Sequence, residues 1–194
     1  MTIAPFALTW EQLPLEQVEA SWDLQQGWGT IPMDPVWRML VLGDGSMTRT
    51  LGLLTGQPIG VEVLTTQGVS GIPKSVSEFL GSARGIVQRR VFLGIPGGER
   101  LVYAVSWWRQ EVLDRYLPQP QWPIGVALAQ QRLAVYRQIL QVYRGSSPFL
   151  AQVWQAQGGL WARRYGMWQQ QQPLTLIDEV FSPHLSRFWQ GYNG

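Results

Sequence analysis

Cysteine is absent from this 194-residue chain, and histidine occurs once, as His184. Disulfides, thiolate nucleophiles and Cys-ligated zinc are therefore excluded, and a lone histidine leaves little room for a catalytic triad. Because His184 follows Pro183 near the C-terminus without a nucleophile elbow, we interpret it as a surface residue in a turn. The glycine patterns lack the spacing of a phosphate-binding loop. We therefore predict no metal and no cofactor.

Long apolar runs are also lacking, and the first residues carry no basic region of the kind that begins a secretory signal. We therefore expect a cytoplasmic protein without stable membrane insertion. The eleven tryptophans are scattered through every segment, with no basic amphipathic helix to carry them to a membrane surface. Packing in the core is the favoured interpretation.

Charge is sparse, at 14% of residues, and nearly balanced, with 15 cationic and 13 anionic side chains. This balance argues against nucleic-acid binding, which needs a clustered basic surface. Every cation except Lys74 is arginine. This usage fits planar recognition of carboxylate or phosphate, although the base composition of a genome would produce the same bias.

The length suits one domain, with residues 1–33 as a peripheral arm or short helices and residues 34–194 as the domain itself. Asp34 followed by Pro35 predicts a helix that ends at Gly43. Ser46 then predicts the cap of a second short helix over 47–54, whose first N–H groups are left free to meet a ligand.

Alternating β-branched and aromatic residues predict strands in the remaining chain. The pairs 85–95 with 100–108 and 160–168 with 174–181 are expected to form hairpins, and 58–69 to form a further strand. Residues 119–125 are expected to be a rigid loop. The period of 127–144 permits either a helix or a strand. We predict an α+β fold, mainly an antiparallel sheet, with helices gathered at one side.

Charged residues inside the apolar strands are the features most suggestive of a site. Arg89 and Arg90 are adjacent, so one of them must face inward on a strand. Asp178 and Glu179 repeat this pattern in the last strand. A buried charge is costly unless it is paired. An internal Arg to Glu bridge or a solvated face would explain the pattern, and so would an inward Arg and Glu that bracket an anionic ligand.

Four blocks of the sequence carry a family resemblance: GDGSMTRTL (43–51), QRRVFLG (88–94) with LVYAVSWW (101–108), WPIG (122–125), and LWARR (160–164) with PLTLIDEVFSP (173–183). In their residues and in their order they resemble the chorismate pyruvate-lyase family, in the longer form typical of cyanobacteria. The resemblance implies a sheet of about six antiparallel strands covered by helices. It also favours a strand over 134–143.

The resemblance further implies which residues bind the substrate. Arg89 would bind the ring carboxylate, helped by the main-chain N–H groups of Met47 and Ile124, and Glu179 would contact the oxygen across the ring. Arg90 would take the place of Arg89 if the register were shifted by one residue. Candidates for the second, enolpyruvyl carboxylate are Arg137 and Arg163. Ser106 lies near a position where other members carry an arginine.

The implied reaction is the cofactor-free cleavage of chorismate to 4-hydroxybenzoate and pyruvate, the first step toward a plastoquinone or ubiquinone ring. We expect the protein to be a monomer. Orientation and electrostatics would supply the rate. Because an ionised carboxylate would be unfavourable beside an anionic substrate, we expect the protonated form of Glu179 to donate a hydrogen bond. We also expect slow release of 4-hydroxybenzoate. The rival interpretations are an effector-binding domain without catalysis and a tryptophan-rich structural protein whose Arg and Glu are merely paired.

Overall fold

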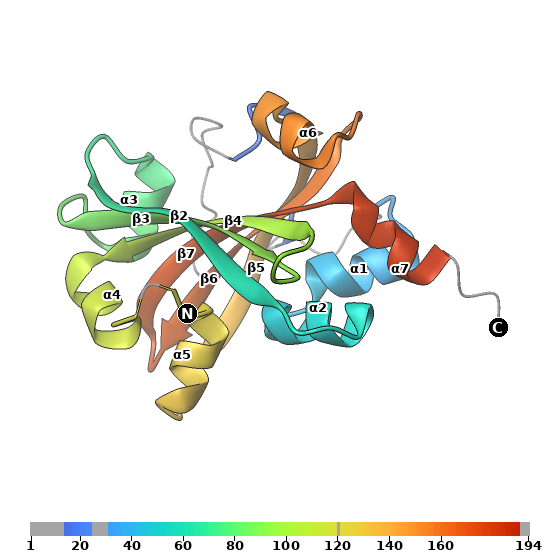
Figure 1. The fold of residues 1–194 in the computed structure, drawn as a ribbon. Coiled ribbons are helices and arrows are strands. Elements are labelled where there is room, and N and C mark those ends of the chain that lie inside the picture. Colours follow the sequence, from blue (N-terminus) through green and yellow to red (C-terminus); the bar gives the residue numbers. More distant parts are fainter. Residues whose placement is uncertain (1–13, 25–30, 120, 191–194) are drawn as a thin grey trace.

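A single antiparallel sheet of seven strands, in the order β1-β5-β6-β7-β4-β3-β2, organises the computed structural model (Figure 1). The structure describes residues 14–24, 31–119 and 121–190. The strands are β1 (Gln17–Asp23), β2 (Gly60–Val69), β3 (Ile86–Gly94), β4 (Arg100–Arg109), β5 (Tyr136–Ser146), β6 (Leu160–Gln169) and β7 (Gln172–Phe181). The α+β class and the antiparallel sheet are thus confirmed, with one strand more than the expected six or so.

Short helices join these strands. They are α1 (Pro35–Leu42), α2 (Met47–Thr55), α3 (Lys74–Leu80), α4 (Gln110–Tyr116), α5 (Ile124–Gln130), α6 (Pro148–Trp154) and α7 (Arg187–Gln190), with a 3₁₀ helix, η2 (Pro183–Ser186). The predicted caps of the first two are confirmed. The Asp34 carboxylate accepts from the Trp37 N–H at 2.9 Å, and the Ser46 hydroxyl accepts from the Arg49 N–H at 3.5 Å.

Helices cover both faces of the sheet, so the expectation that they gather at one side was wrong. α3 and α6 pack on one face, which we call the α3–α6 face. α1, α2, α4 and α5 pack on the other, the α1–α5 face. The reason is that β3, β4, β6 and β7 are buried on both sides, so neither face can be left to water.

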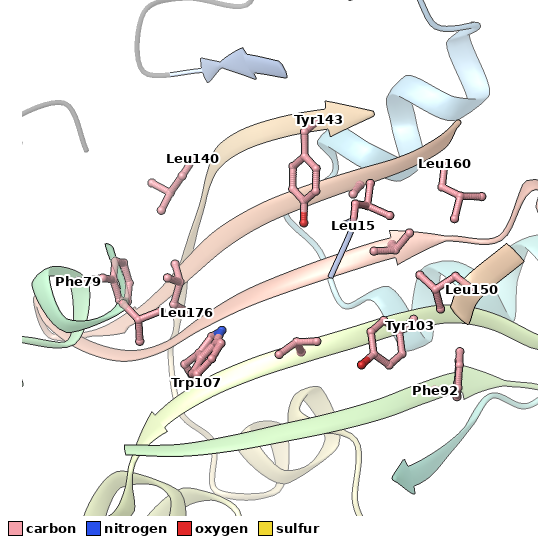
Figure 2. Close-up of a cluster of buried hydrophobic side chains, with 14 of the residues drawn as sticks. Leu15, Phe79, Phe92, Tyr103, Trp107, Leu140, Tyr143, Leu150, Leu160 and Leu176 are labelled. Atoms are coloured by element: carbon pink, nitrogen blue, oxygen red, sulfur yellow. The ribbon is translucent and has the colours of Figure 1, made fainter. Parts of the chain in front are cut away.

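The α3–α6 face holds the larger aromatic core. Figure 2 shows Phe79 of α3, Phe92 of β3, and Tyr103 and Trp107 of β4 among its buried side chains. Phe92 and Tyr103 pack with ring centroids 5.1 Å apart. The burial of Trp107 in this cluster agrees with the core-packing role expected for the tryptophans. The cavity described below lies on the α1–α5 face.

Both predicted hairpins and the 58–69 strand are confirmed, and the ambiguous segment is a strand from Tyr136. Two expectations need correction. The 119–125 loop ends early, because Pro123 caps α5 and Ile124 begins it. The expected arm over 1–33 contributes β1, which pairs with β5 at the sheet edge, and is not helical there. Residues 1–13 and 25–30 lie outside the described residues, and the division at residue 33 stays a prediction.

Candidate active site

A narrow cavity of about 50 Å³ lies on the α1–α5 face, between the middle of the sheet and the beginnings of α2 and α5. Its floor comes from β3, β4, β6 and β7, and its roof from residues 45–48 and 123–125. The polar and charged side chains in its wall are Ser46, Thr48, Arg89, Ser106, Arg137, Tyr165 and Glu179. Segments far apart in sequence therefore meet at one small enclosed space.

Arg89 reaches this cavity from β3 and is 2% exposed. Its Nη2 donates to the Trp122 carbonyl at 3.2 Å, which ties the floor of the cavity to the segment that leads into α5. Burial lowers the pKa of Arg89 to about 10, so it stays cationic at neutral pH. Arg90, the next residue, is exposed on the α3–α6 face, which resolves which of the two arginines faces the cavity.

Glu179 enters the cavity from β7, directly opposite Arg163 on β6 in the sheet register. Its Oε2 accepts from Arg163 Nε at 2.8 Å and lies 2.7 Å from Arg163 Nη2. Its Oε1 accepts from the Tyr165 hydroxyl at 2.9 Å. The carboxylate is therefore held at both oxygens, and the pairing with Arg163 is the internal Arg to Glu bridge that the sequence analysis left open.

Arg163 is buried behind Glu179 and does not line the cavity. Its Nη1 donates to three main-chain carbonyls at the end of α1, those of Leu40 at 3.3 Å, Val41 at 3.2 Å and Gly43 at 2.6 Å. All its nitrogens thus have protein partners. Arg163 joins Glu179 to the turn that leads into α2, a placement unlike that of the substrate-binding residue suggested by the resemblance.

Arg137 lines the cavity from β5 and is half-buried. Among the described residues it has neither an ion-pair partner nor a hydrogen-bond acceptor for its side chain. Its charge acts on Tyr165, whose pKa is raised mainly by burial and then by Glu179, while Arg163 and Arg137 oppose the shift. Of the two arginines proposed for the second carboxylate, Arg137 is the one whose charge faces the cavity.

The roof of the cavity contains two helix beginnings. Met47 is the first residue of α2 and Ile124 the first of α5. The first N–H groups of a helix have no acceptor within it. The two segments also approach each other closely, because a Cβ added at Gly125 would lie 2.9 Å from the Ser46 hydroxyl oxygen. Met47 and Ile124 are thus brought to the same cavity as Arg89.

Tyr165 is the wall residue that the sequence reasoning missed. It lies two residues after Arg163 on β6, so strand alternation places both on one face, and this was a usable signal. Ser106, which pairs with Arg89 across the sheet, accepts from the Trp108 indole N–H at 2.9 Å. The role of the Trp122 carbonyl as an acceptor for Arg89 could not be predicted from the sequence, because every residue type has a main-chain carbonyl.

Within the described part of the chain, no three His, Asp or Glu side chains gather closely enough to hold a metal ion. Within the same residues, no helix is long and apolar enough to cross a membrane.

Structural comparison shows that this fold also occurs in other bacterial proteins. The effector domain of PhnF from Mycobacterium smegmatis superposes with a TM-score of 0.57 at 12% identity, over 74% of this chain and 92% of that domain. The possible transcriptional regulator YydK from Bacillus subtilis gives 0.56 at 13% identity, over 68% and 60%. At these identities the similarity concerns the fold alone.

Sequence comparison is more specific. The protein ycf21 of Porphyra purpurea is 31% identical over 160 residues, which cover 82% of this chain and 87% of that protein. The chorismate pyruvate-lyase of Mycobacterium leprae is 30% identical over 162 residues, 77% of this chain and 75% of that enzyme. A family model described as chorismate pyruvate-lyase Rv2949c-like matches residues 41–189. The chain therefore belongs to the Rv2949c-like chorismate pyruvate-lyase family.

Proposed function

We propose that this protein cleaves chorismate to 4-hydroxybenzoate and pyruvate without a cofactor. The observation that carries the proposal is the meeting of Arg89, Arg137 and Glu179 in one enclosed cavity. Two arginines suit a substrate with two carboxylates, because guanidinium to carboxylate hydrogen bonds are strong and directional. The M. leprae relative, named chorismate pyruvate-lyase, supports the same reading.

In this proposal Arg89 binds the ring carboxylate, and the N–H groups of Met47 and Ile124 complete its site. Arg137 binds the enolpyruvyl carboxylate from the other wall. This assignment gives Arg137 the contact that other members are expected to make through an arginine near Ser106. Arg163 serves instead to position Glu179, since its own donors are all engaged.

Glu179 would face the ring oxygen across from the carboxylate. Oriented by Tyr165 and paired with Arg163, it would accept a hydrogen bond from the substrate's ring hydroxyl. This role differs from that of the hydrogen-bond donor expected from the sequence, because Arg163 and Tyr165 already donate to the carboxylate. The pairing with Arg163 also offsets the repulsion between Glu179 and a dianionic substrate.

The proposed reaction requires little covalent chemistry from the protein. The bond between the ring carbon and the ether oxygen breaks, a proton leaves the neighbouring ring carbon, and the ring becomes aromatic. The released enolpyruvate gains a proton at its methylene carbon and becomes pyruvate. Orientation in a dry cavity and donors aimed at the departing enolpyruvate would supply the acceleration.

The shape of the cavity bears on product release. The cavity is small, at about 50 Å³, and Ser46 lies close to Gly125 at its roof, so we propose that the two roof segments separate for entry and exit. We therefore expect release of 4-hydroxybenzoate to limit turnover. A progress curve without product inhibition would contradict this expectation.

We further propose that the enzyme acts as a cytoplasmic monomer and supplies the ring of a plastoquinone-type quinone. The second candidate function is binding of a small effector without turnover, which is favoured by the fold shared with the PhnF effector domain. The same cavity would then hold a carboxylate ligand that is released unchanged.

The test is to incubate the purified protein with chorismate, without added metal, and to quantify pyruvate and 4-hydroxybenzoate. Equimolar products, lost in Arg89→Ala and retained in Arg84→Ala, would support the lyase. Arg84 is exposed in the turn before β3, so its variant removes the same charge away from the cavity. Binding of 4-hydroxybenzoate without turnover would favour the effector-binding function. If the protein shows neither turnover nor binding, both candidate functions are refuted.

A further inference from the structure

A second concave surface lies on the α3–α6 face, on the reverse side of the strands that carry the proposed active site. It is a groove of about 480 Å³. Its walls come from β2, β3 and β4, from residues 14 and 16, and from the beginning of α6. The side chains that matter for binding are Thr65, Arg90, Tyr103 and Phe149.

Arg90 is the positive charge in this groove. Its Nε donates to the Gln88 side-chain oxygen at 2.8 Å. Within the described part of the chain the guanidinium has no carboxylate partner. Glu16 also lies along the groove, exposed at its rim, and makes no ion pair with Arg90. The terminal guanidinium nitrogens are thus available to a ligand, and a planar pair of donors is what a carboxylate binds best.

Two hydroxyl groups beside Arg90 have no described partner. Tyr103 is 5% exposed, and its hydroxyl makes no hydrogen bond to any described residue. Its pKa is raised by burial and lowered in part by the charge of Arg90, so the hydroxyl is a donor close to that charge. The Thr65 hydroxyl oxygen is buried and also lacks a partner. Since buried polar groups are normally satisfied, the Thr65 hydroxyl points to a ligand, and the Tyr103 hydroxyl adds a donor at the surface of the groove.

An apolar wall adjoins the polar groups. Phe149 is 46% exposed, and its ring lies 5.8 Å from the ring of Tyr103, centroid to centroid. Leu64, an exposed residue at the bulge of β2, and Val105 complete this wall. An exposed phenylalanine next to unsatisfied donors suits a ligand with a flat apolar body and one anionic end.

We propose that this groove is a binding site for a small aromatic carboxylate, held by Arg90, Tyr103 and Thr65 and stacked against Phe149. It is separate from the proposed active site, because Arg89 and Arg90 are adjacent on β3 and face opposite sides of the sheet. The inference does not depend on the proposed function.

The test uses radiolabelled benzoate and equilibrium dialysis against the intact protein. We expect Arg90→Ala to weaken the groove site at least about tenfold, since a hydrogen bond to a charged group contributes roughly 1.5–3 kcal/mol. Tyr103→Phe keeps the ring and its packing, and is expected to weaken the same site about threefold to tenfold. Arg84→Ala is the charge-matched control and is expected to bind as the wild type does.

The number of sites separates this proposal from the previous one. If the active site also takes benzoate, the wild type binds two molecules, and Arg90→Ala and Arg89→Ala each retain one. If the active site does not take benzoate, the wild type binds one molecule, which Arg90→Ala loses and Arg89→Ala keeps. Binding that is unchanged in both Arg90→Ala and Tyr103→Phe would overturn the groove site, and so would the absence of any benzoate binding.

Discussion

Two buried ion pairs lie back to back on the β6–β7 hairpin, and their difference separates structure from function. Arg163 pairs with Glu179 on the α1–α5 face, and Arg164 pairs with Asp178 on the α3–α6 face. Each pair links one residue of β6 to the residue opposite it on β7, and the two pairs are neighbours along both strands. Both pairs consist of a buried arginine and a buried carboxylate, but only the first pair borders the cavity.

The Arg164 to Asp178 pair is closed. Arg164 Nε and Nη2 donate to the two carboxylate oxygens, each at 2.8 Å, and the Tyr143 hydroxyl donates to Oδ1 at 3.1 Å. Arg164 Nη1 lies 3.4 Å from the Ser75 hydroxyl of α3. Burial opposes the charge of Arg164, but Asp178 outweighs it and the pKa of Arg164 is raised. This pair anchors α3 and has no room for a ligand.

The Arg163 to Glu179 pair is open on one side. Both nitrogens that contact the carboxylate use the same oxygen, Oε2, so Oε1 is left to Tyr165 and to the cavity. The remaining nitrogen of Arg163 holds the turn before α2. The comparison teaches that a buried pair can border a cavity when the arginine occupies only one carboxylate oxygen.

Asp178→Asn is expected to have the largest effect of all. It leaves the charge of Arg164 buried without its partner, and breaking such a pair costs about 3–5 kcal/mol of unfolding free energy. Urea denaturation followed by tryptophan fluorescence would measure this loss. A loss below about 1 kcal/mol would show that the closed pair is not the anchor described here.

Glu179→Gln is the matched amide substitution on the open side. We expect chorismate turnover to fall about 100-fold, because a neutral amide no longer orients the substrate as the carboxylate does. The loss of unfolding free energy should be smaller than in Asp178→Asn, since the carbonyls of Leu40, Val41 and Gly43 still accept from Arg163. Turnover close to that of the wild type would remove Glu179 from the mechanism.

The two tyrosines offer a subtler contrast. Tyr165→Phe removes the hydroxyl that holds Glu179, and we expect kcat to fall about fivefold to tenfold with KM little changed. Tyr143→Phe removes the equivalent hydroxyl from the closed pair and should lower the unfolding free energy by about 1 kcal/mol without altering kcat. Steady-state kinetics and denaturation of both variants would check this. Equal kinetic effects would erase the distinction between the faces.

Alkaline pH tests the closed pair through stability alone. Burial, followed by the charge of Asp178, raises the pKa of Tyr143. An unfolded tyrosine loses its proton near pH 10. Above that pH the unfolded chain binds fewer protons than the folded one, so the stability from Tyr143 is present below pH 10 and is lost as pH rises.

The measurement is the unfolding free energy of wild type and Tyr143→Phe between pH 9 and about 11.5. The difference between them should shrink with a slope of up to about 1.4 kcal/mol per pH unit. The lowered pKa of Arg89 has the opposite sign in this window, but it contributes to both proteins and cancels. A difference that stays constant with pH would contradict the raised pKa of Tyr143.

Local signals in the sequence were sufficient for the elements whose causes are local. Asp34 with Pro35 and the hydroxyl of Ser46 predicted the starts of α1 and α2, because capping involves residues within one helical turn. The hairpins followed from alternation on either side of a turn. α5 was missed at its beginning, since Pro123 was interpreted as part of a rigid loop and not as a cap.

The candidate site was predicted only as far as residue types allowed. Resemblance suggested Met47, Arg89, Ile124, Arg137 and Glu179, and the structure brings these five to one cavity. Their roles toward a ligand remain proposals. Arg163 was suggested as a substrate contact, yet its nitrogens donate to Glu179 and to main-chain carbonyls some 120 residues away in sequence.

By itself, the sequence determined the α+β class, the helix caps, the two hairpins, and the presence of charged residues inside apolar strands. Composition, capping and alternation act over a few residues, so they can be read without a fold. Only the tertiary structure decided that Arg89 and not Arg90 faces the cavity, that helices cover both faces, and that Arg163 supports Glu179. These outcomes depend on strand register and on contacts between distant segments, which exist only once the sheet has formed.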